Sequence, residues 1–109
     1  MELTTQKCVP CEGGVPPLRG KALQDFASQL TLSWELIEEK IIRHTFKFKN
    51  FKEGVAFINK VADIAEAEGH HPDLNLFGYN KVTVTLMTHA INGLSANDFI
   101  LAAKIETLI

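Results

Sequence analysis

The sequence predicts a single α+β domain in the order α-β-β-α-β-β-α, with a four-stranded antiparallel sheet and the helices packed on one face. Three observations lead to this fold class. Apolar residues repeat at helical spacing in three segments and at a spacing of two in the segments between them. A length of 109 residues suits one domain. The connections between the expected strands are short, as in antiparallel hairpins.

The first part of the chain is predicted to form a helix followed by a hairpin. Residues 18–30 show helical spacing, while residues 34–36 and 42–48 alternate as half-buried strands do. Glu38 and Glu39 form the polar turn between these strands. The repeating positions are Leu23, Phe26, Ala27, Leu30, Trp34, Leu36, Ile42, His44, Phe46 and Phe48.

The central element is a helix over residues 51–68. Asn50 is suited to the N-cap, and Glu53 follows at the spacing of a capping box. Gly69 supplies the C-terminal stop, because glycine readily adopts the left-handed conformation that ends helices. The apolar face consists of Phe51, Val55, Ile58, Val61, Ala62 and Ala65.

The last part of the chain is predicted to form a second hairpin and a final helix. Strands near residues 74–76 and 82–86 are joined by a hairpin connection at 77–80. Ser95 and Asp98 have capping-box spacing, and they open a helix whose apolar side carries Leu101, Ile105 and Leu108. The sheet face away from the helices carries Thr83, Thr85 and Met87, and it is either wet or partly used for self-association.

Composition excludes several classes of function. The net charge is −2, so no basic field is present for nucleic acid. No apolar run approaches the ~20 residues that span a bilayer. The segment from Met1 to Lys7 lacks the apolar region of a signal peptide, which favours a cytoplasmic protein. The small core favours association of the chain with copies of itself.

Residues 1–17 are expected to be a flexible leader, and the domain covers residues 18–109. The leader contains Cys8 and Cys11 in a C-x-x-C spacing, within a stretch rich in proline and glycine. Such a pair is half of a zinc site or a redox motif, but no strand precedes it as a redox motif requires. Cysteines without chemistry are the favoured interpretation, and a metal or disulfide role stays open.

The residues best suited to chemistry lie where the helix over 51–68 ends. His70 and His71 follow the helix stop and precede Pro72, which disfavours the helical conformation for His71. The two imidazoles therefore point in different directions and cannot form an i, i+4 zinc pair. Interaction with the helix end is one alternative. Zinc binding together with His89 is another, and we expect no metal.

The spacing of seven residues resembles the signature of pterin-4a-carbinolamine dehydratases. The resemblance extends over about residues 22–108 and leaves the leader outside it. The residues that carry it are Glu66, His70, His71, Pro72, Tyr79, His89 and Asp98. Members of this family dehydrate 4a-hydroxytetrahydropterin, a by-product of aromatic amino acid hydroxylases, to quinonoid dihydropterin. The resemblance thus implies a small pterin substrate and no bound cofactor. Together with the small core, it predicts a homodimer or homotetramer.

The resemblance also implies site residues. It makes His70, His71 and His89 catalytic. The substrate-binding residues are expected to be Glu66, Pro72, Thr88, Trp34 and Asp98. Imidazole, with a pKa of about 6.5, can give or take a proton near neutral pH, and the reaction needs both steps.

Three of the implied substrate-binding residues have other interpretations. Glu66 either orients an imidazole or is a solvated carboxylate at a helix end. Trp34 is either near the site or part of the core. Helix capping alone explains Asp98, and we favour it.

A binding module is the alternative to an enzyme. The leader resembles one found in dehydratase-like proteins that assist assembly of RuBisCO. Those relatives often have a degraded histidine motif, whereas His70, His71 and His89 are intact here. The intact set favours the enzyme.

Overall fold

The computed structural model describes residues 3–9 and 16–109 of the chain. A short 3-10 helix, η1 (Leu3–Thr5), precedes helix α1 (Gly20–Ala27) and the hairpin of β1 (Glu35–Ile37) and β2 (Ile41–Lys47). Helix α2 (Phe51–Glu68) follows, and then the hairpin of β3 (Asp73–Phe77) and β4 (Lys81–Leu86). A second 3-10 helix, η2 (His89–Ile91), leads to helix α3 (Ala96–Glu106).

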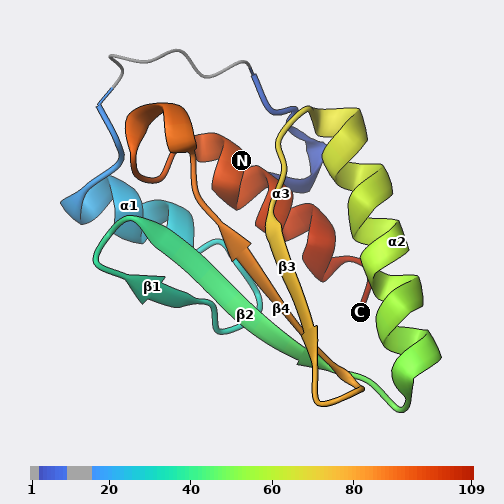
Figure 1. Ribbon diagram of the computed structural model, residues 1–109. Coiled ribbons are helices and arrows are strands. Elements are labelled where there is room, and N and C mark those ends of the chain that lie inside the picture. Colours follow the sequence, from blue (N-terminus) through green and yellow to red (C-terminus); the bar gives the residue numbers. More distant parts are fainter. Residues whose placement is uncertain (1–2, 10–15) are drawn as a thin grey trace.

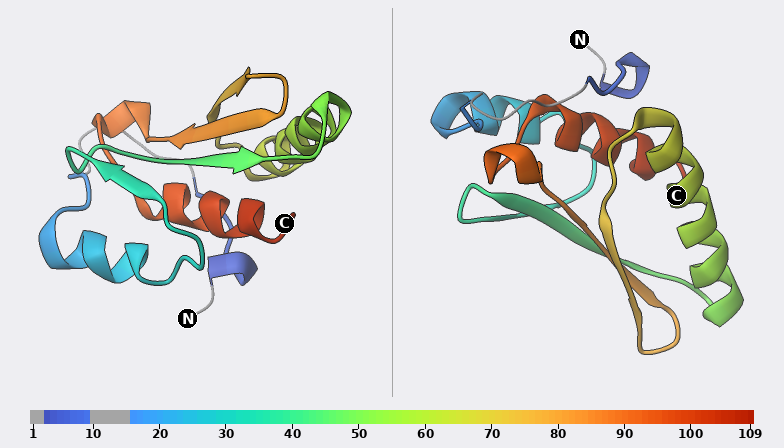
Figure 2. Two further views of the ribbon diagram at one scale, coloured as in Figure 1. Left: turned by 90° about the horizontal axis from the view of Figure 1, so that it is seen from below. Right: turned by 45° about the horizontal axis from the view of Figure 1, so that its top comes forward.

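The four strands form one antiparallel sheet in the order β1-β2-β4-β3. The helices lie on one face of this sheet, as Figures 1 and 2 show. The predicted fold class and order of elements are therefore confirmed. Within the described residues, no helix combines the length and apolar character needed to cross a membrane.

Helix α3 is the centre of the core. It lies between the sheet on one side and α1 with η1 on the other (Figure 2). Phe99, Leu101 and Ile105 are completely buried in it. They pack with inward residues of β2 and β4, which are Ile42, Phe46, Val82, Val84 and Leu86.

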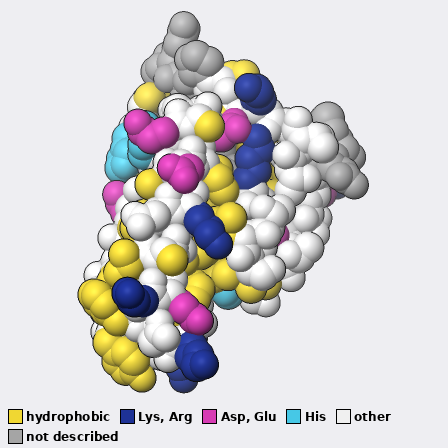
Figure 3. All heavy atoms as spheres, turned by 90° about the vertical axis from the view of Figure 1, so that its right-hand side faces the viewer, with side chains coloured by type: hydrophobic (Ala, Val, Ile, Leu, Met, Phe, Trp, Pro, Cys, Tyr) yellow, Lys and Arg dark blue, Asp and Glu magenta, His cyan; other side chains and the backbone are white. Residues whose placement is uncertain are grey.

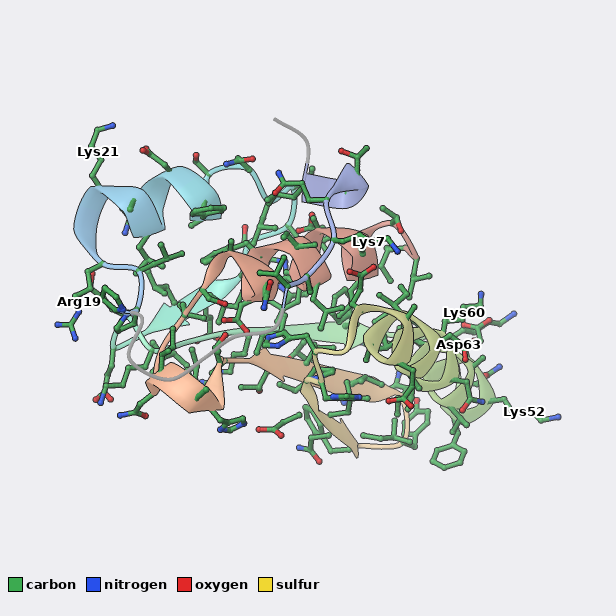
Figure 4. The ribbon with its side chains drawn as sticks, turned by 90° about the horizontal axis from the view of Figure 1, so that it is seen from above. Lys7, Arg19, Lys21, Lys52, Lys60 and Asp63 are labelled. Carbon is green, nitrogen blue, oxygen red and sulfur yellow. The ribbon has the colours of Figure 1, made fainter. Side chains whose placement is uncertain are left out.

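Helix α2 lies beside β3 and β4 and presents one face to the core. Its bounds agree with the prediction, because both caps are local. The Asn50 side chain accepts a hydrogen bond from the Glu53 N–H, and Gly69 ends the helix with a φ of 67°. On the outer side Lys52, Lys60 and Asp63 point away from the molecule (Figure 4).

The first helix is shorter than predicted. It covers Gly20–Ala27, whereas the apolar spacing extends over residues 18–30. Leu18 is held instead by a bond from its N–H to the Leu94 carbonyl at 2.8 Å. After Ala27 the chain tightens into turns, and Leu30 packs on the core without being helical.

The N-terminal segment, defined here as residues 3–9, packs against the domain. Leu3 is buried in the core cluster, and η1 contacts α3. Cys8 is a half-buried free thiol. Cys11 lies outside the described residues. The domain boundary at residue 17 stays a prediction.

Candidate functional site

A cavity of about 270 Å³ lies where the end of α2, the end of β4 and the start of α3 meet. It brings together the three histidines that the sequence singled out. The residues that line it are Val9, Gly69, His70, His71, Met87, Thr88, His89, Ala90 and Asn97.

The end of α2 delivers two of the histidines. Gly69 adopts a left-handed conformation, so the chain leaves the helix axis at this residue. His70 still donates its backbone N–H to the Ala65 carbonyl at 3.3 Å, which fixes the first step out of the helix. Pro72 then leads into β3 and is outside the cavity lining.

The His70 ring is held by Asp98. Its Nε2 lies 2.7 Å from Asp98 Oδ1, and the Asp98 side chain is completely buried. The other carboxylate oxygen, Oδ2, accepts hydrogen bonds from Thr88 Oγ1 at 2.7 Å and from the Ser95 N–H at 3.0 Å. The predicted capping box is present. Asp98 therefore caps α3 and orients His70 at the same time.

The second histidine pairs with the carboxylate predicted to orient an imidazole. His71 Nε2 lies 2.5 Å from Glu66 Oε2, and both side chains are exposed. The partner of Glu66 is thus His71, five residues later, and not His70. Because both groups are in solvent, this pair contributes little to stability.

The third histidine comes from beyond the sheet. His89 is the first residue of η2, three residues after the end of β4; it is exposed and lines the cavity. The preceding Thr88 is buried and also bonds to the Ser95 hydroxyl at 2.8 Å. A backbone bond from the Thr88 N–H to the Gly93 carbonyl, at 2.7 Å, closes the loop that carries His89.

Trp34 lies away from this cavity. Its Nε1 donates to Glu106 Oε2 at 2.9 Å, and its ring packs against His44 and Phe46 with centroid distances of 5.6 and 6.0 Å. The structure therefore shows the core-packing alternative for Trp34 within this chain. His44, a repeating position of the predicted strand, also bonds through Nδ1 to the Ser33 carbonyl at 3.0 Å.

A larger cavity of about 490 Å³ lies between η1, the end of α1 and the end of α3. No histidine lines this cavity, and the carboxylate of its lining residue Glu106 is already hydrogen-bonded within the protein. Glu106 accepts hydrogen bonds from Thr31, from the Leu32 N–H and from Trp34 Nε1. The histidine cavity is the better candidate because three imidazoles, which can give and accept protons near neutral pH, line it.

Five residues of the cavity lining were not predicted as site residues, and they are Val9, Gly69, Met87, Ala90 and Asn97. Val9 was assigned to the leader, and Asn97 carried no signal beyond its place in a helix. In the structure the Asn97 side chain bonds to the backbone of Val9 in both directions. Their separation of 88 residues explains why no local pattern could indicate the contact.

The Cys8 thiol is not suited to act as a thiolate. Burial, followed by the negative charge of Glu68, raises the pKa of Cys8 from 9.0 to about 12. Hydrogen bonds from Lys104 and from the Cys8 N–H lower the pKa of Glu68. Among residues 3–9 and 16–109, no group of three or more His, Cys, Asp or Glu side chains is placed to hold a metal ion.

Comparison with known proteins decides the family. The family model for pterin 4 alpha carbinolamine dehydratase matches residues 16–108. This chain belongs to the pterin-4a-carbinolamine dehydratase family. A protein of Nitrosomonas europaea that carries this dehydratase name provisionally is 50% identical, over 98% of this chain and 93% of its own. A relative in Rubrobacter xylanophilus with the same provisional name is 46% identical, over 98% of both chains.

Solved structures agree with this family. A transcriptional coactivator/pterin dehydratase from Brucella melitensis has a TM-score of 0.77 and 31% identity, covering 84% of this chain and 97% of its own. A pterin dehydratase-like protein described as a RuBisCO assembly factor in the alpha-carboxysome has a TM-score of 0.60 and 25% identity. It covers 72% of this chain and 90% of its own. Both described activities thus occur on the dehydratase fold.

Proposed function

We propose that this protein dehydrates 4a-hydroxytetrahydropterin to quinonoid dihydropterin and water, as a step in the recycling of tetrahydrobiopterin. One observation carries the proposal. His70 is fixed by a buried carboxylate at a cavity that His71 and His89 also line. A cytoplasmic location remains part of the prediction.

The reaction requires two proton movements. Hydroxide leaves C4a and takes a proton to become water, while N5 loses a proton and the new double bond forms between these atoms. Imidazoles give and accept protons near neutral pH, so three of them around one small heterocycle supply both steps.

The bonding of each ring suggests its part. A carboxylate only accepts hydrogen bonds, so the contact with Asp98 favours a proton on His70 Nε2. His70 Nδ1 is then free to accept a proton, which makes His70 our candidate for the base. His71, paired with the Glu66 carboxylate, and His89 are our candidates for the acid. Thr88 and Asp98 support the site through their bonds.

The decisive experiment is a dehydration assay on chemically generated 4a-hydroxytetrahydropterin, with the spontaneous rate subtracted. We expect His70→Ala, His71→Ala and His89→Ala each to slow turnover, toward the roughly 10²–10⁴-fold typical of acid–base groups. A neighbouring imidazole can partly substitute, so single losses fall at the low end of this range. Replacing both His70 and His89 should be more damaging than either change alone.

His44→Ala is the matched control. His44 packs between Trp34 and Phe46, so its loss should lower the melting temperature and leave turnover unchanged. Treatment with a chelator should also leave turnover unchanged, because the proposed steps need no metal. Near-normal turnover in all three cavity variants, with the fold intact, would show that the histidines are not catalytic.

A binding module is the second candidate function. It is favoured by the likeness to the pterin dehydratase-like RuBisCO assembly factor. The same assay separates the two functions. A folded wild-type protein that does not accelerate dehydration above the spontaneous rate would leave assembly or binding as the function of this fold.

A further inference from the structure

The N-terminal segment is attached to the domain beside the histidine cavity. Its backbone is held at Cys8, whose N–H donates to Glu68 Oε1 at 2.8 Å. Glu68 is itself fixed by Lys104, with 2.6 Å between Oε2 and Nζ and little exposure of either side chain. The Cys8 thiol lies 3.5 Å from the Asn97 carbonyl. Figure 4 shows the segment passing over α3.

Asn97 makes a second and more specific attachment. Its Oδ1 accepts from the Val9 N–H at 3.0 Å, and its Nδ2 donates to the Val9 carbonyl at 2.6 Å. The Asn97 side chain thus accepts one hydrogen bond from Val9 and donates another to it, and Asn97 is only 5% exposed. Such a paired contact fixes the position and the orientation of the backbone at Val9.

The residue fixed in this way contributes little to the core. Val9 is 66% exposed, so its side chain adds little to the burial that stabilises the domain. It does line the cavity that holds His70, His71 and His89. Asn97 and Asp98 are neighbours in the first turn of α3, and each positions one lining residue of the cavity by hydrogen bonds. Asp98 binds the ring of the catalytic candidate His70, and Asn97 binds the backbone of the apolar residue Val9.

We propose that Val9 is a substrate-contacting residue of the histidine cavity and that Asn97 is its positioning residue. This inference rests on the proposed function and adds to it an apolar wall for the pterin. A flat heterocycle with a polar edge is bound by a few polar groups and by apolar surface that removes water from its faces. The histidines supply the polar groups, and Val9 supplies apolar surface in a position that Asn97 fixes in advance.

The first test measures binding of 7,8-dihydrobiopterin, a stable dihydropterin, by isothermal titration. Val9→Ala should weaken binding roughly three- to tenfold, since two methyl groups leave the contact. The variant cannot fail to fold for lack of core packing, because Val9 is exposed. The matched control is Val55→Ala, an exposed valine on α2 outside the cavity lining, which should bind as the wild type does. Equal affinity of Val9→Ala and wild type would overturn the proposal.

The second test concerns Asn97. Asn97→Ala should weaken binding by at least as much as Val9→Ala. The double variant should bind no more weakly than Asn97→Ala alone, because both changes remove the same wall. Additive losses would assign Asn97 a purely structural role and contradict the positioning part.

Hydrogen exchange at the Val9 amide gives a readout that does not depend on any ligand. We expect slow exchange in the wild type and fast exchange in Asn97→Ala, because the bond to Oδ1 is lost. Fast exchange in the wild type would overturn the attachment itself. Slow exchange together with no dihydropterin binding by the wild type would overturn the proposed function, and with it the role of Val9 as a pterin contact. The two failures are thus distinguishable.

Discussion

Asp98 uses one carboxylate for two purposes. Oδ1 accepts from His70, while Oδ2 accepts from Thr88 and from the Ser95 N–H at the start of α3. Because the side chain is completely buried, each of these donors depends on it rather than on water. The two carboxylate oxygens of Asp98 therefore link the stability of the domain to the geometry of the candidate site.

We predict that Asp98→Asn lowers both stability and turnover. The amide keeps one accepting oxygen, so its NH₂ group must face either His70 or the donors Thr88 and Ser95. A buried donor without an acceptor costs about 1–3 kcal/mol in the free energy of unfolding, which urea denaturation measures. Asp63→Asn, on the exposed side of α2, is the control and should change stability by less than about 0.5 kcal/mol. An Asp98→Asn protein as stable as the wild type would contradict this account.

Cys8 should react slowly with alkylating agents. Its pKa is raised to about 12, chiefly by burial, so the thiolate that reacts is scarce at pH 8. Site-resolved mass spectrometry after iodoacetamide treatment should show far slower labelling of Cys8 in the folded protein than in urea. Similar rates in both conditions would contradict the structure.

The same shift predicts how stability changes at high pH. The protonated thiol is favoured in the folded state, so its contribution to stability is complete below the unfolded pKa of 9.0. It is lost as the pH rises from 9 toward 12. A Cys8→Ser variant should show a smaller loss of stability across this range in urea denaturation. An equal loss would mean that other groups cause it.

At the scale of elements, helix bounds that depend on local caps could be predicted from the sequence, whereas features that depend on long-range contacts could not. The bounds of α2 were predictable because Asn50 and Gly69 act on the nearest turn. The first helix was predicted too long because Leu30 packs on the core although it lies in a turn after the helix. Its apolar character continues the helical spacing of the sequence, but the backbone there is not helical.

The candidate site was predictable only in part, and for the same physical reason. His70 and His71 directly follow Gly69, which marks the helix end in the sequence. The capping role of Asp98 was predicted from its position three residues after Ser95. The bond between His70 and Asp98 spans 28 residues, and it depends on how α3 packs against the sheet. The resemblance to the family supplied His89. Nothing in the spacing indicated that Val9 would lie beside it.

Loss of the α2 cap gives a prediction at this scale. Asn50→Ala removes the acceptor of the Glu53 N–H and should cost about 1 kcal/mol in the free energy of unfolding. Asn59→Ala, on an exposed turn in the middle of the same helix, is the control. It should leave stability unchanged or raise it, since alanine favours helix interiors. Equal effects of the two substitutions in urea denaturation would show that the cap is not used.

At the scale of the molecule, the surface retains features that suit self-association. Strands β1 and β3 form the two edges of the sheet. Exposed apolar side chains gather near the start of α2 and at the β3–β4 hairpin, which lie together at the lower end of the face in Figure 3. These residues are Phe51, Val55, Phe77 and Tyr79.

We propose that the protein is a homodimer or homotetramer. An open sheet edge and contiguous apolar surface are stabilised when a second copy covers them, and closed symmetry limits the number of subunits. Light scattering across a wide range of concentrations should give two or four chain masses. A constant value of about one chain mass would refute the proposal.

The double use of the first turn of α3 sets a limit on how this protein can be redesigned. A library that varies residues 97 and 98 in search of higher thermostability also changes the hydrogen bonds that position Val9 and His70. Stabilising substitutions selected there would tend to be inactive, and activity-restoring ones would have to regain the same bonds. Engineering is freer on the outer side of α2, where Lys52, Lys60 and Asp63 point away from the molecule (Figure 4).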